Sequence, residues 1–327
     1  MEPLTRKKRT STLVMANYNH ARYLPDSLSS IFSQTRPIDE VIVIDDASTD
    51  NSLEVLAQFQ GYESRLKVLR NDRNRGAVYS VNRGLSEAQG ELICFHSADD
   101  FIVPTFFERS VGMLEAYPQA GLCTSFFSSV RDSDKEVSPG VLPWGDKPTY
   151  IAPQDLINVE VAGGIPGHAS IYDKQSVIAA GGLIPELQWH CDWFMIHVIA
   201  ARQGFCFIPE SLAFFRMTEG GSYGSGRSNW REQKKVVGNI LRLIFSDAFK
   251  DVIPFFQASV MMSHLYPDIG RFIVEEAAFL SHEEFVAVLR MLKKQEQQKI
   301  ISVIGANKNL FPELHDVCVE YQSKLAS

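Results

Sequence analysis

The chain has 327 residues, of which 45% are hydrophobic, and its 32 Lys and Arg against 39 Asp and Glu give a formal net charge of −7. This composition is typical of a globular protein with one large domain or two, and its acid excess argues against nucleic acid as the main partner, because counterion release needs clustered cations. Five cysteines without a C-x-x-C spacing argue against a zinc site and favour free thiols in a reducing cytoplasm.

The sequence contains no apolar run long enough to span a bilayer, and its first 30 residues lack the apolar segment of a signal peptide. We therefore expect a cytoplasmic protein. The basic run Arg6-Lys-Lys-Arg9 is either solvated or in contact with anionic lipid, which leaves open a peripheral position on the inner face of the membrane.

Short β-prone segments alternate with helical ones in the first part of the chain. Strands are expected at 11–16, 40–44, 66–69 and from 91 onward, and helices at 23–34, 53–60 and 78–89. Four strands that alternate with three helices predict a right-handed, mostly parallel, Rossmann-like α/β sheet.

Two of these strands end in paired carboxylates, Asp45-Asp46 after the second and Asp99-Asp100 after the fourth. In an open parallel sheet both strand ends face the crevice where ligands bind. Adjacent carboxylates repel unless a cation lies between or beside them, and oxygen ligands suit Mg²⁺ or Mn²⁺. Taken alone, the second pair also fits a solvated turn or a helix N-cap before Pro104. The presence of such a pair at the ends of two strands favours a single binding cleft.

The pattern is less regular in the second part of the chain. Helices are expected at 106–117, 173–180 and 189–202, strands at 121–127, 169–172, 205–208 and 213–215, a connector at 137–153 and a mobile glycine-rich loop at 218–228. From Trp230 the pattern is helical throughout. We therefore expect one domain over 1–229, with halves at about 11–130 and 150–229, and a helical region over 230–327.

A cleft with carboxylates at two strand ends can bind a sugar ring, a divalent cation, or both. A cation there would hold a diphosphate and stabilise the negative charge that develops when a nucleoside diphosphate leaves a sugar. The attacking hydroxyl then needs a base, and Asp192 at the start of a helix is our candidate. The alternative for Asp192 is a structural charge stabilised by the helix dipole.

With these motifs in place, the sequence resembles the GT-A fold glycosyltransferases of family 2 over roughly residues 11–220. The resemblance rests on the order and spacing of short motifs that are weak one by one. They are Leu13-Val-Met-Ala-Asn-Tyr-Asn19, Ser33-Gln-Thr35, Val41-Ile-Val-Ile-Asp-Asp-Ala-Ser-Thr-Asp-Asn-Ser52, Asn74-Arg-Gly76, Asn82-Arg-Gly84, Gly90-Glu-Leu-Ile93, Ala98-Asp-Asp100, Gly181-Gly182, and Asp192 followed by a helix and Arg202-Gln-Gly204.

The resemblance implies a GT-A fold with a C-terminal helical extension, a nucleoside-diphosphate sugar donor, Mn²⁺ or Mg²⁺ as cofactor, and a saccharide or lipid-linked saccharide acceptor. The activity implied is that of a hexosyltransferase in surface polysaccharide or glycolipid synthesis. Transfer would be a single displacement with inversion, and Asp192 would act as general base. Its transition state would have oxocarbenium character.

The resemblance also assigns roles at the donor site. Asp46 would bind the nucleotide base in a pocket lined by Ala16 and Tyr18, and Ser97 would reach a ribose hydroxyl. Asn74 and Gly76 would lie by the diphosphate, Asp99 would ligate the metal, and Asp100 would lie close to the sugar or the metal. Arg216 would meet the donor beside the glycine-rich loop, which is expected to close as a lid; Arg75, Arg83 and Arg227 are further candidate cations.

His168 and Trp189 are candidate acceptor contacts, with a structural role as the alternative for each. The chain departs from the family pattern at three positions. Ser97 stands where many relatives carry Asp, Cys191 stands where an acid often precedes the base, and Val81 stands where an arginine is common.

These departures motivate an alternative function, a nucleotide-sugar-binding protein without transferase activity. A receiver-type signalling domain fits the α/β pattern but is much shorter than this chain, and a dinucleotide-binding dehydrogenase is disfavoured because no strand is followed by G-x-G-x-x-G. The helical tail would cover the acceptor site, form a homo-oligomer or lie on a membrane. Its mixed charge at 293–299 favours a solvated or partner-facing surface.

Overall fold

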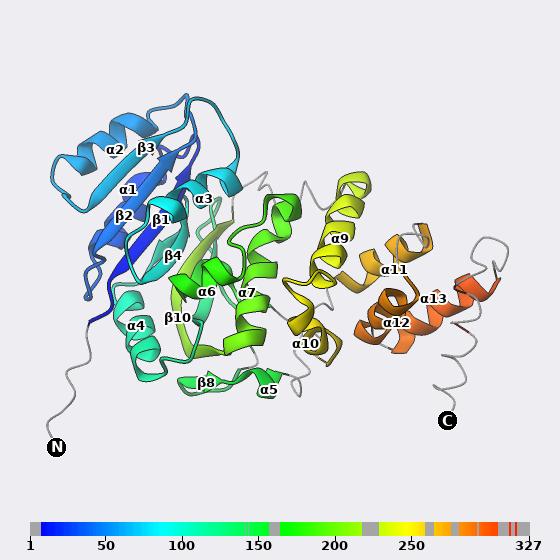
Figure 1. The fold of residues 1–327 in the computed structure, drawn as a ribbon. Helices are drawn as coiled ribbons and strands as arrows, with labels where there is room; N and C mark the ends of the chain where they lie inside the picture. Colours follow the sequence, from blue (N-terminus) through cyan, green and yellow to red (C-terminus); the bar gives the residue numbers. More distant parts are fainter. Residues whose placement is uncertain are drawn as a thin grey trace, which may run out of the picture. The chain divides into compact units, whose positions relative to one another are not determined.

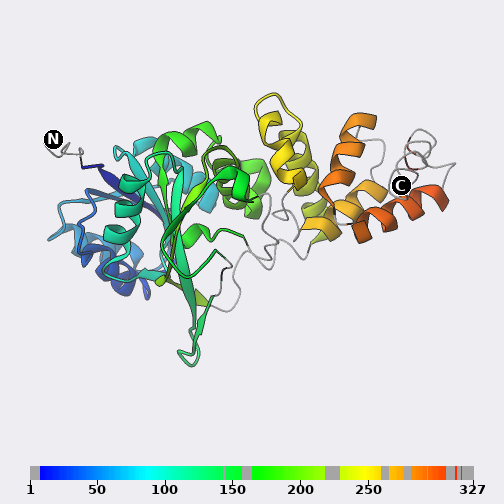
Figure 2. The same cartoon turned by 90° about the horizontal axis from the view of Figure 1, so that it is seen from below.

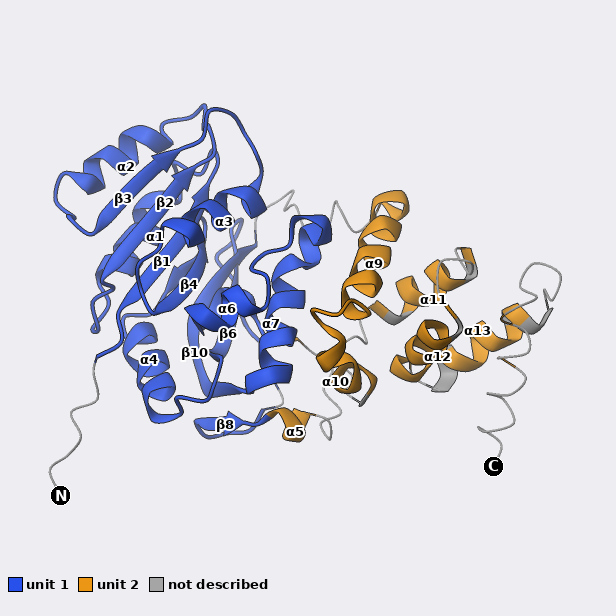
Figure 3. Cartoon of the chain, viewed as in Figure 1, with its two compact units in different colours: residues 1–152, 165–221 blue, residues 153–164, 222–327 orange. Residues whose placement is uncertain are grey.

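The computed structural model of the protein describes residues 8–140, 142, 144–156, 164–217, 229–258, 265–275, 281–292, 294–306, 314 and 318. The predicted glycine-rich loop at 218–228, Arg227 within it, and the first two residues of the basic run at 6–9 lie outside this part of the chain. Two compact units divide the molecule, residues 1–152 with 165–221 and residues 153–164 with 222–327 (Figure 3). The domain boundary near residue 229 stays a prediction.

The first unit contains ten strands and the helices that cover them. The strands are β1 (Ser11–Asn17), β2 (Glu40–Asp45), β3 (Leu66–Arg70), β4 (Leu92–Ser97), β5 (Phe101–Ile102), β6 (Leu122–Arg131), β7 (Val137–Pro139), β8 (Thr149–Ile151), β9 (Ser170–Asp173) and β10 (Phe205–Met217). The helices are α1 (Leu24–Phe32), α2 (Ser52–Gln60), α3 (Ala77–Glu87), α4 (Phe106–Ala116), η1 (Gly167–Ala169), α6 (Lys174–Ala179), η2 (Pro185–His190) and α7 (Cys191–Gln203).

All ten strands form one sheet in the order β3-β2-β1-β4-β9-β6-β10-β5, with β7 added to β6 and β8 to β10 (Figure 1). Strands β1 to β4 are parallel, and β9 lies antiparallel between β4 and β6. The hairpin that joins β6 and β7 projects from the rest of the unit (Figure 2). The predicted α/β architecture with a central sheet flanked by helices is confirmed.

The first strands are buried on both faces. Leu13 and Val41 lie in the core shared with α1 and α2, whereas Val14 and Ile42 lie in a second core with Leu85 of α3. A strand covered on both faces has no solvent side, so its sequence is continuously apolar instead of alternating. This explains the uninterrupted apolar runs in β1 and β2.

Two sequence predictions for the second half need correction. The expected strands at 205–208 and 213–215 are one strand, β10, whose register with β6 shifts between Ile208 and Ala213. Pro209 lies in this irregular stretch, where a missing N–H is tolerated. The expected connector at 137–153 contains β7 and β8, and Trp144 within it is buried with its ring 5.0 Å from that of Phe205.

The regular elements described in the second unit are all helices. Its helices are α5 (Pro153–Leu156), α9 (Trp230–Ile244), η3 (Lys250–Val252), α10 (Ile253–Ala258), α11 (Tyr266–Glu275), α12 (His282–Met291) and α13 (Lys294–Ala306). A capping box starts α12, because Ser281 and Glu284 exchange hydrogen bonds between side chain and backbone. Among the described residues, no helix combines the length and the apolar character needed to cross a bilayer.

The parallel register aligns the ends of β1, β2 and β4. Asn17 pairs with Asp45, and Ala16 pairs with both Ile44 and Ser97. The two acidic pairs that follow β2 and β4 therefore lie at one edge of the sheet, as the strand pattern predicts.

The close approach of α3 to the sheet depends on Gly84. A Cβ at this position would lie 2.4 Å from Val14 Cγ1 and 2.6 Å from Ile44 Cδ1, both in the middle of the sheet. We expect Gly84→Ala to lower the free energy of unfolding by about 1–3 kcal/mol, because overpacking displaces helix and strand. Urea denaturation measures the effect.

Gly112 of α4 is the matched control, since it is exposed and a Cβ there would meet no atom within 4 Å. Gly112→Ala should raise stability by about 0.5–1 kcal/mol through helix propensity. Equal effects of the two alanines would refute the packing argument.

Candidate active site

Asp46 follows β2 and is held by the turn after β3. Its Oδ1 accepts hydrogen bonds from Asn71 Nδ2 at 2.6 Å and from the backbone N–H of Arg75 at 2.9 Å, and its Oδ2 accepts one from the backbone N–H of Gly76 at 2.8 Å. Gly76 has a φ of +87°, a conformation that glycine adopts without strain. A carboxylate has about four acceptor positions, so Asp46 retains one for a ligand.

Asp45 ties the turn after β2 to the end of β1. It is fully buried and accepts hydrogen bonds from Asn17 Nδ2 at 2.9 Å and from the backbone N–H of Ser48 at 3.1 Å. Ala16 and Tyr18 flank Asn17, and Tyr18 is 42% exposed. The predicted base-pocket residues Ala16, Tyr18 and Asp46 thus lie around one strand end, with Tyr18 open to solvent.

The second acidic pair is tied to β10. The Asp100 side chain is buried, and its Oδ1 accepts a hydrogen bond from the backbone N–H of Arg216 at 2.8 Å. Arg216 Nε donates to the backbone carbonyl of Asp99 at 2.9 Å. His96 Nε2 lies 3.2 Å from the carbonyl of Asp100, and Ser97 ends β4 exposed to solvent. The turn is therefore braced through its backbone.

The Asp99–Asp100 pair fits a divalent cation. The buried Oδ2 of Asp100 has no hydrogen-bond partner. Burial raises the pKa of Asp100 to about 8, the N–H of Arg216 lowers it, and the neighbouring charge of Asp99 raises it. A buried oxygen without a donor is stabilised by a proton or by a cation. The described residues contain no cluster of three or more His, Cys, Asp and Glu suited to a metal, so any cation here would need ligands from the substrate.

Asp192 lies in the first turn of α7. Its Oδ1 accepts a hydrogen bond from the backbone N–H of Trp193 at 2.7 Å, and its Oδ2 lies 3.3 Å from where a Cβ of Gly167 would stand. Asp192 is exposed by its surface area. Neighbouring protein atoms nevertheless desolvate its carboxylate, and this desolvation raises its pKa. An exposed carboxylate with a raised pKa is a suitable proton acceptor.

Two histidines connect Asp192 with the acidic turn. His168 follows Gly167, which lies against Asp192, and its ring is close enough to His96 for the two to affect each other electrostatically. Burial lowers the pKa of each histidine to about 4, so both are neutral near pH 7. Because His96 in turn contacts the carbonyl of Asp100, Asp192 and the metal-binding candidates belong to one contiguous region of the first unit.

The candidate acceptor residues His168 and Trp189 both lie against aromatic rings. His168 packs edge-to-face on Phe127, with ring centroids 4.6 Å apart, so its structural role and its acceptor role stay equally open. Trp189 is half-buried beside His190, with centroids 6.4 Å apart. Burial raises the pKa of the Cys191 thiol to about 12, so this thiol stays protonated near pH 7.

The candidate cations are already paired. Arg75 bonds to Asp72 at 3.0 Å, and Arg83 Nη1 donates to the carbonyl of Arg70 at 2.8 Å and to Asn71 Oδ1 at 2.6 Å. Asn74 accepts the backbone N–H of Gly76 at 3.0 Å. The predicted diphosphate contacts of these residues stay predictions.

Sequence reasoning missed three residues that shape the site. Asn71 ties Asp46 to α3 through Ser80, while Tyr23 and Asp132 hold the surroundings of Arg216. Asn71 carried a usable signal, since it directly follows β3 at the ligand-binding edge. Asp132 carried none, because Tyr23 and Arg216, which tie it to the site, are distant from it in sequence.

A mixed sheet whose parallel strands β1 to β4 end in acidic turns, flanked by helices, is typical of the GT-A fold. The chain belongs to glycosyl transferase family 2, because the model of that family matches residues 12–177. The resemblance stated from sequence is therefore confirmed.

Known proteins of this class are similar over different spans. An uncharacterized glycosyltransferase of Nostoc sp. is 25% identical over 68% of this chain and 69% of its own length. A cholesterol galactosyltransferase of Borreliella burgdorferi is 31% identical over 39% of this chain and 35% of its own. A mannosyltransferase of Pyrobaculum calidifontis, solved with GDP-Man and Mn²⁺, has a TM-score of 0.56 at 17% identity, covering 94% of this chain and 89% of that one, and shows the same fold.

The hydrogen bonds of Asp46 lead to a stability prediction. Asp46→Asn would replace one acceptor oxygen with an NH₂ group that faces an N–H donor, so we expect a loss of about 1–3 kcal/mol in the free energy of unfolding. Nucleotide binding should weaken in parallel. Urea denaturation and nucleotide titration measure the two effects. Asp72→Asn on the same loop is the control, and its exposed pair with Arg75 should leave both unchanged; a stable Asp46→Asn protein would contradict the prediction.

Proposed function

We propose that the protein transfers a sugar from a nucleoside-diphosphate sugar to an acceptor hydroxyl with inversion. The observation that carries this proposal is the gathering of Asp46, the Asp99–Asp100 turn and Asp192 around the carboxyl edge of one sheet. Membership of glycosyl transferase family 2 supports it.

The donor would bind along the ends of β1, β2 and β4. Asp46 offers its remaining acceptor position to the nucleotide base, and Tyr18 offers an exposed ring beside it. Ser97 is exposed at the end of β4 and is available to a ribose hydroxyl. The diphosphate would follow the turn at Asn74 and Gly76.

Asp99 and Asp100 would hold Mn²⁺ or Mg²⁺. When bound, the ion supplies Lewis-acid stabilisation of the leaving diphosphate. The GDP-Man and Mn²⁺ in the Pyrobaculum structure support this choice of donor class and metal. In this chain, Arg216 contacts the Asp99–Asp100 turn, because its N–H donates to the Asp100 carboxylate and its Nε donates to the Asp99 carbonyl.

Asp192 would remove the proton of the acceptor hydroxyl. The hydroxyl oxygen forms a bond to the anomeric carbon while the bond from that carbon to the diphosphate breaks, and the proton moves to the carboxylate. The acceptor would be a saccharide or a lipid-linked saccharide in surface polysaccharide or glycolipid synthesis, for which the cholesterol galactosyltransferase relative offers a lipid precedent.

Donor binding and transfer can be measured separately. With a panel of UDP- and GDP-sugars, one donor at 100 times its Kd should stabilise the protein by about 2.7 kcal/mol in the presence of Mn²⁺. Asp99→Ala should abolish the metal-dependent part, and Asp72→Ala on the exposed loop should not. Release of nucleoside diphosphate with an acceptor pool then reports transfer. Donor binding without release from any acceptor pool would support the alternative of a binding protein.

The base role of Asp192 predicts a split between binding and turnover. Asp192→Asn should retain donor affinity while kcat falls by about 10²–10⁴-fold, and an equal loss of both would reject the role. Because the pKa of Asp192 is raised, kcat should fall on the acid side at a higher pH than for an ordinary Asp. The pH dependence of kcat is measured at saturating metal and donor, so that protonation of Asp100 does not contribute to it. In the Asp192→Asn variant, kcat should not show this fall on the acid side.

A further inference from the structure

Arg216 lies beside the Asp99–Asp100 turn and is buried against aromatic rings. Its side chain is 8% exposed, and the guanidinium lies 4.9 Å from the ring centroid of Tyr23 and 5.6 Å from that of Phe101. A cation between two aromatic rings is held by cation–π attraction on both sides. The side chain is thus fixed within the protein and is not extended into solvent.

The polar contacts of Arg216 run in two directions. Toward the site, its Nε donates to the carbonyl of Asp99 and its backbone N–H donates to the carboxylate of Asp100. Away from the site, Nη1 lies 3.5 Å from Asp132 Oδ1 and Nη2 lies 3.5 Å from Asp26 Oδ2. Arg216 therefore connects the acidic turn to α1 and to the hairpin between β6 and β7.

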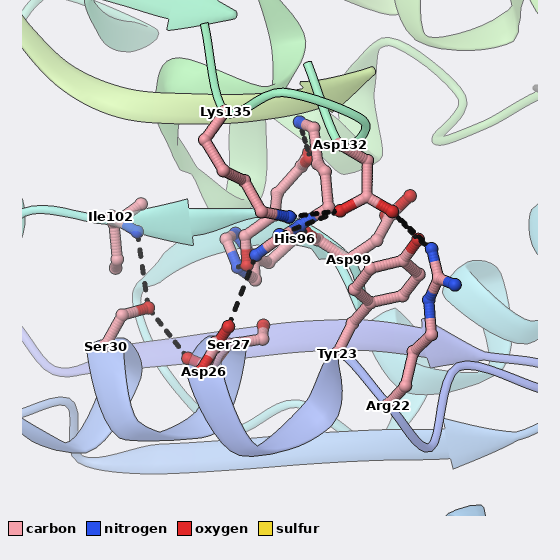
Figure 4. Close-up of polar contacts among 12 residues, drawn as sticks. Arg22, Tyr23, Asp26, Ser27, Ser30, His96, Asp99, Ile102, Asp132 and Lys135 are labelled. Atoms are coloured by element: carbon pink, nitrogen blue, oxygen red, sulfur yellow. Dashed lines mark hydrogen bonds and ion pairs between the residues drawn. The ribbon is translucent and has the colours of Figure 1, made fainter. Parts of the chain in front are cut away.

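Asp132 is itself anchored by several donors. It accepts hydrogen bonds from Tyr23 Oη at 2.8 Å and from Lys135 Nζ at 2.7 Å, and it pairs with Arg22 (Figure 4). Tyr23 and Asp26 come from the start of α1, while Asp132 and Lys135 come from the hairpin, and they gather beside Asp99 (Figure 4). The hairpin and α1 hold Asp132 in place, which in turn fixes the guanidinium.

We propose that Arg216 is a positioning residue that preorganises the Asp99–Asp100 turn, with Asp132 and Asp26 as its anchors, so that the turn meets a cation and the donor in a fixed geometry. In this role, Arg216 does not contact the donor directly. The expected effect on metal binding rests on the proposed function, whereas the ordering of the turn does not depend on any activity.

The anchoring explains why an arginine is needed. A planar guanidinium presents five donors in fixed directions and can address the Asp99 carbonyl, Asp26 and Asp132 together. The three donors of a lysine ammonium radiate from one nitrogen, so they cannot reach acceptors that lie around the edges of a planar fork. Groups that orient metal ligands without touching the metal typically change metal affinity by about 10–100-fold when they are removed.

The test uses the full chain with two variants and one control. Asp132→Asn removes an anchor on the projecting hairpin, and Arg216→Lys removes the fork inside the protein. Glu136→Gln changes the same hairpin at an exposed ion pair with Arg131 and leaves the donors to Asp132 in place. Asp132→Asn keeps the experiment decisive if Arg216→Lys fails to fold.

The first readout is hydrogen–deuterium exchange of residues 97–102 in the protein without ligands. Both variants should exchange faster than the wild type in this segment, and Glu136→Gln should match the wild type. Unchanged exchange in Asp132→Asn would overturn the proposal, whether or not the protein is a transferase.

The second readout is Mn²⁺ affinity measured by electron paramagnetic resonance, together with donor KM. We expect Mn²⁺ binding to weaken by about 10–100-fold in both variants, with KM rising more than kcat falls. If Arg216 instead contacted the donor directly, Asp132→Asn would leave Mn²⁺ affinity unchanged in the absence of donor, which would overturn the positioning role. A wild type that binds Mn²⁺ but releases no nucleoside diphosphate would contradict only the proposed function.

Discussion

Buried carboxylates at the carboxyl edge of the sheet need hydrogen-bond donors or a cation, and this requirement organises the surrounding chain. Asp45 receives donors from Asn17 and Ser48, and Asp46 receives three donors from the turn after β3. Asp100 receives one backbone N–H and keeps a buried oxygen without a partner. Because an uncompensated buried charge is costly, this oxygen marks where a proton or a cation belongs.

The carboxylates of the candidate site are held in different ways. Asp46 is buried and held by the turn after β3, and Asp100 is buried and held by the backbone N–H of Arg216 in β10. Asp192 is exposed, and its carboxylate accepts a hydrogen bond from the N–H of Trp193. In the proposed reaction, the buried carboxylates would fix the donor, and the exposed base would stay accessible to the acceptor.

The part of the fold that sequence predicts is the part set by local pattern. The runs in β1 and β2 are continuously apolar because both faces are covered, and the paired acids at Asp46 and Asp100 follow from strands that end at one edge. The contacts of Arg216 follow from no such pattern. Asp132 and Asp26 lie 84 and 190 residues away from it in the chain. Their pairing depends on the tertiary fold, as does the continuity of β10 through an irregular register.

Ser97 stands where many relatives carry a metal-binding Asp, and its presence is compatible with the proposed cation. Ser97 is exposed at the end of β4, whereas Asp100 lies buried three positions later with an open oxygen beside Asp99. Mg²⁺ sites that bind nucleotides use one or two protein carboxylates and take phosphate oxygens for the rest. Asp99 and Asp100 meet that count without Ser97. The substitution therefore lowers the negative charge that attracts the ion, and the binding of the ion comes to depend more strongly on the diphosphate that arrives with it.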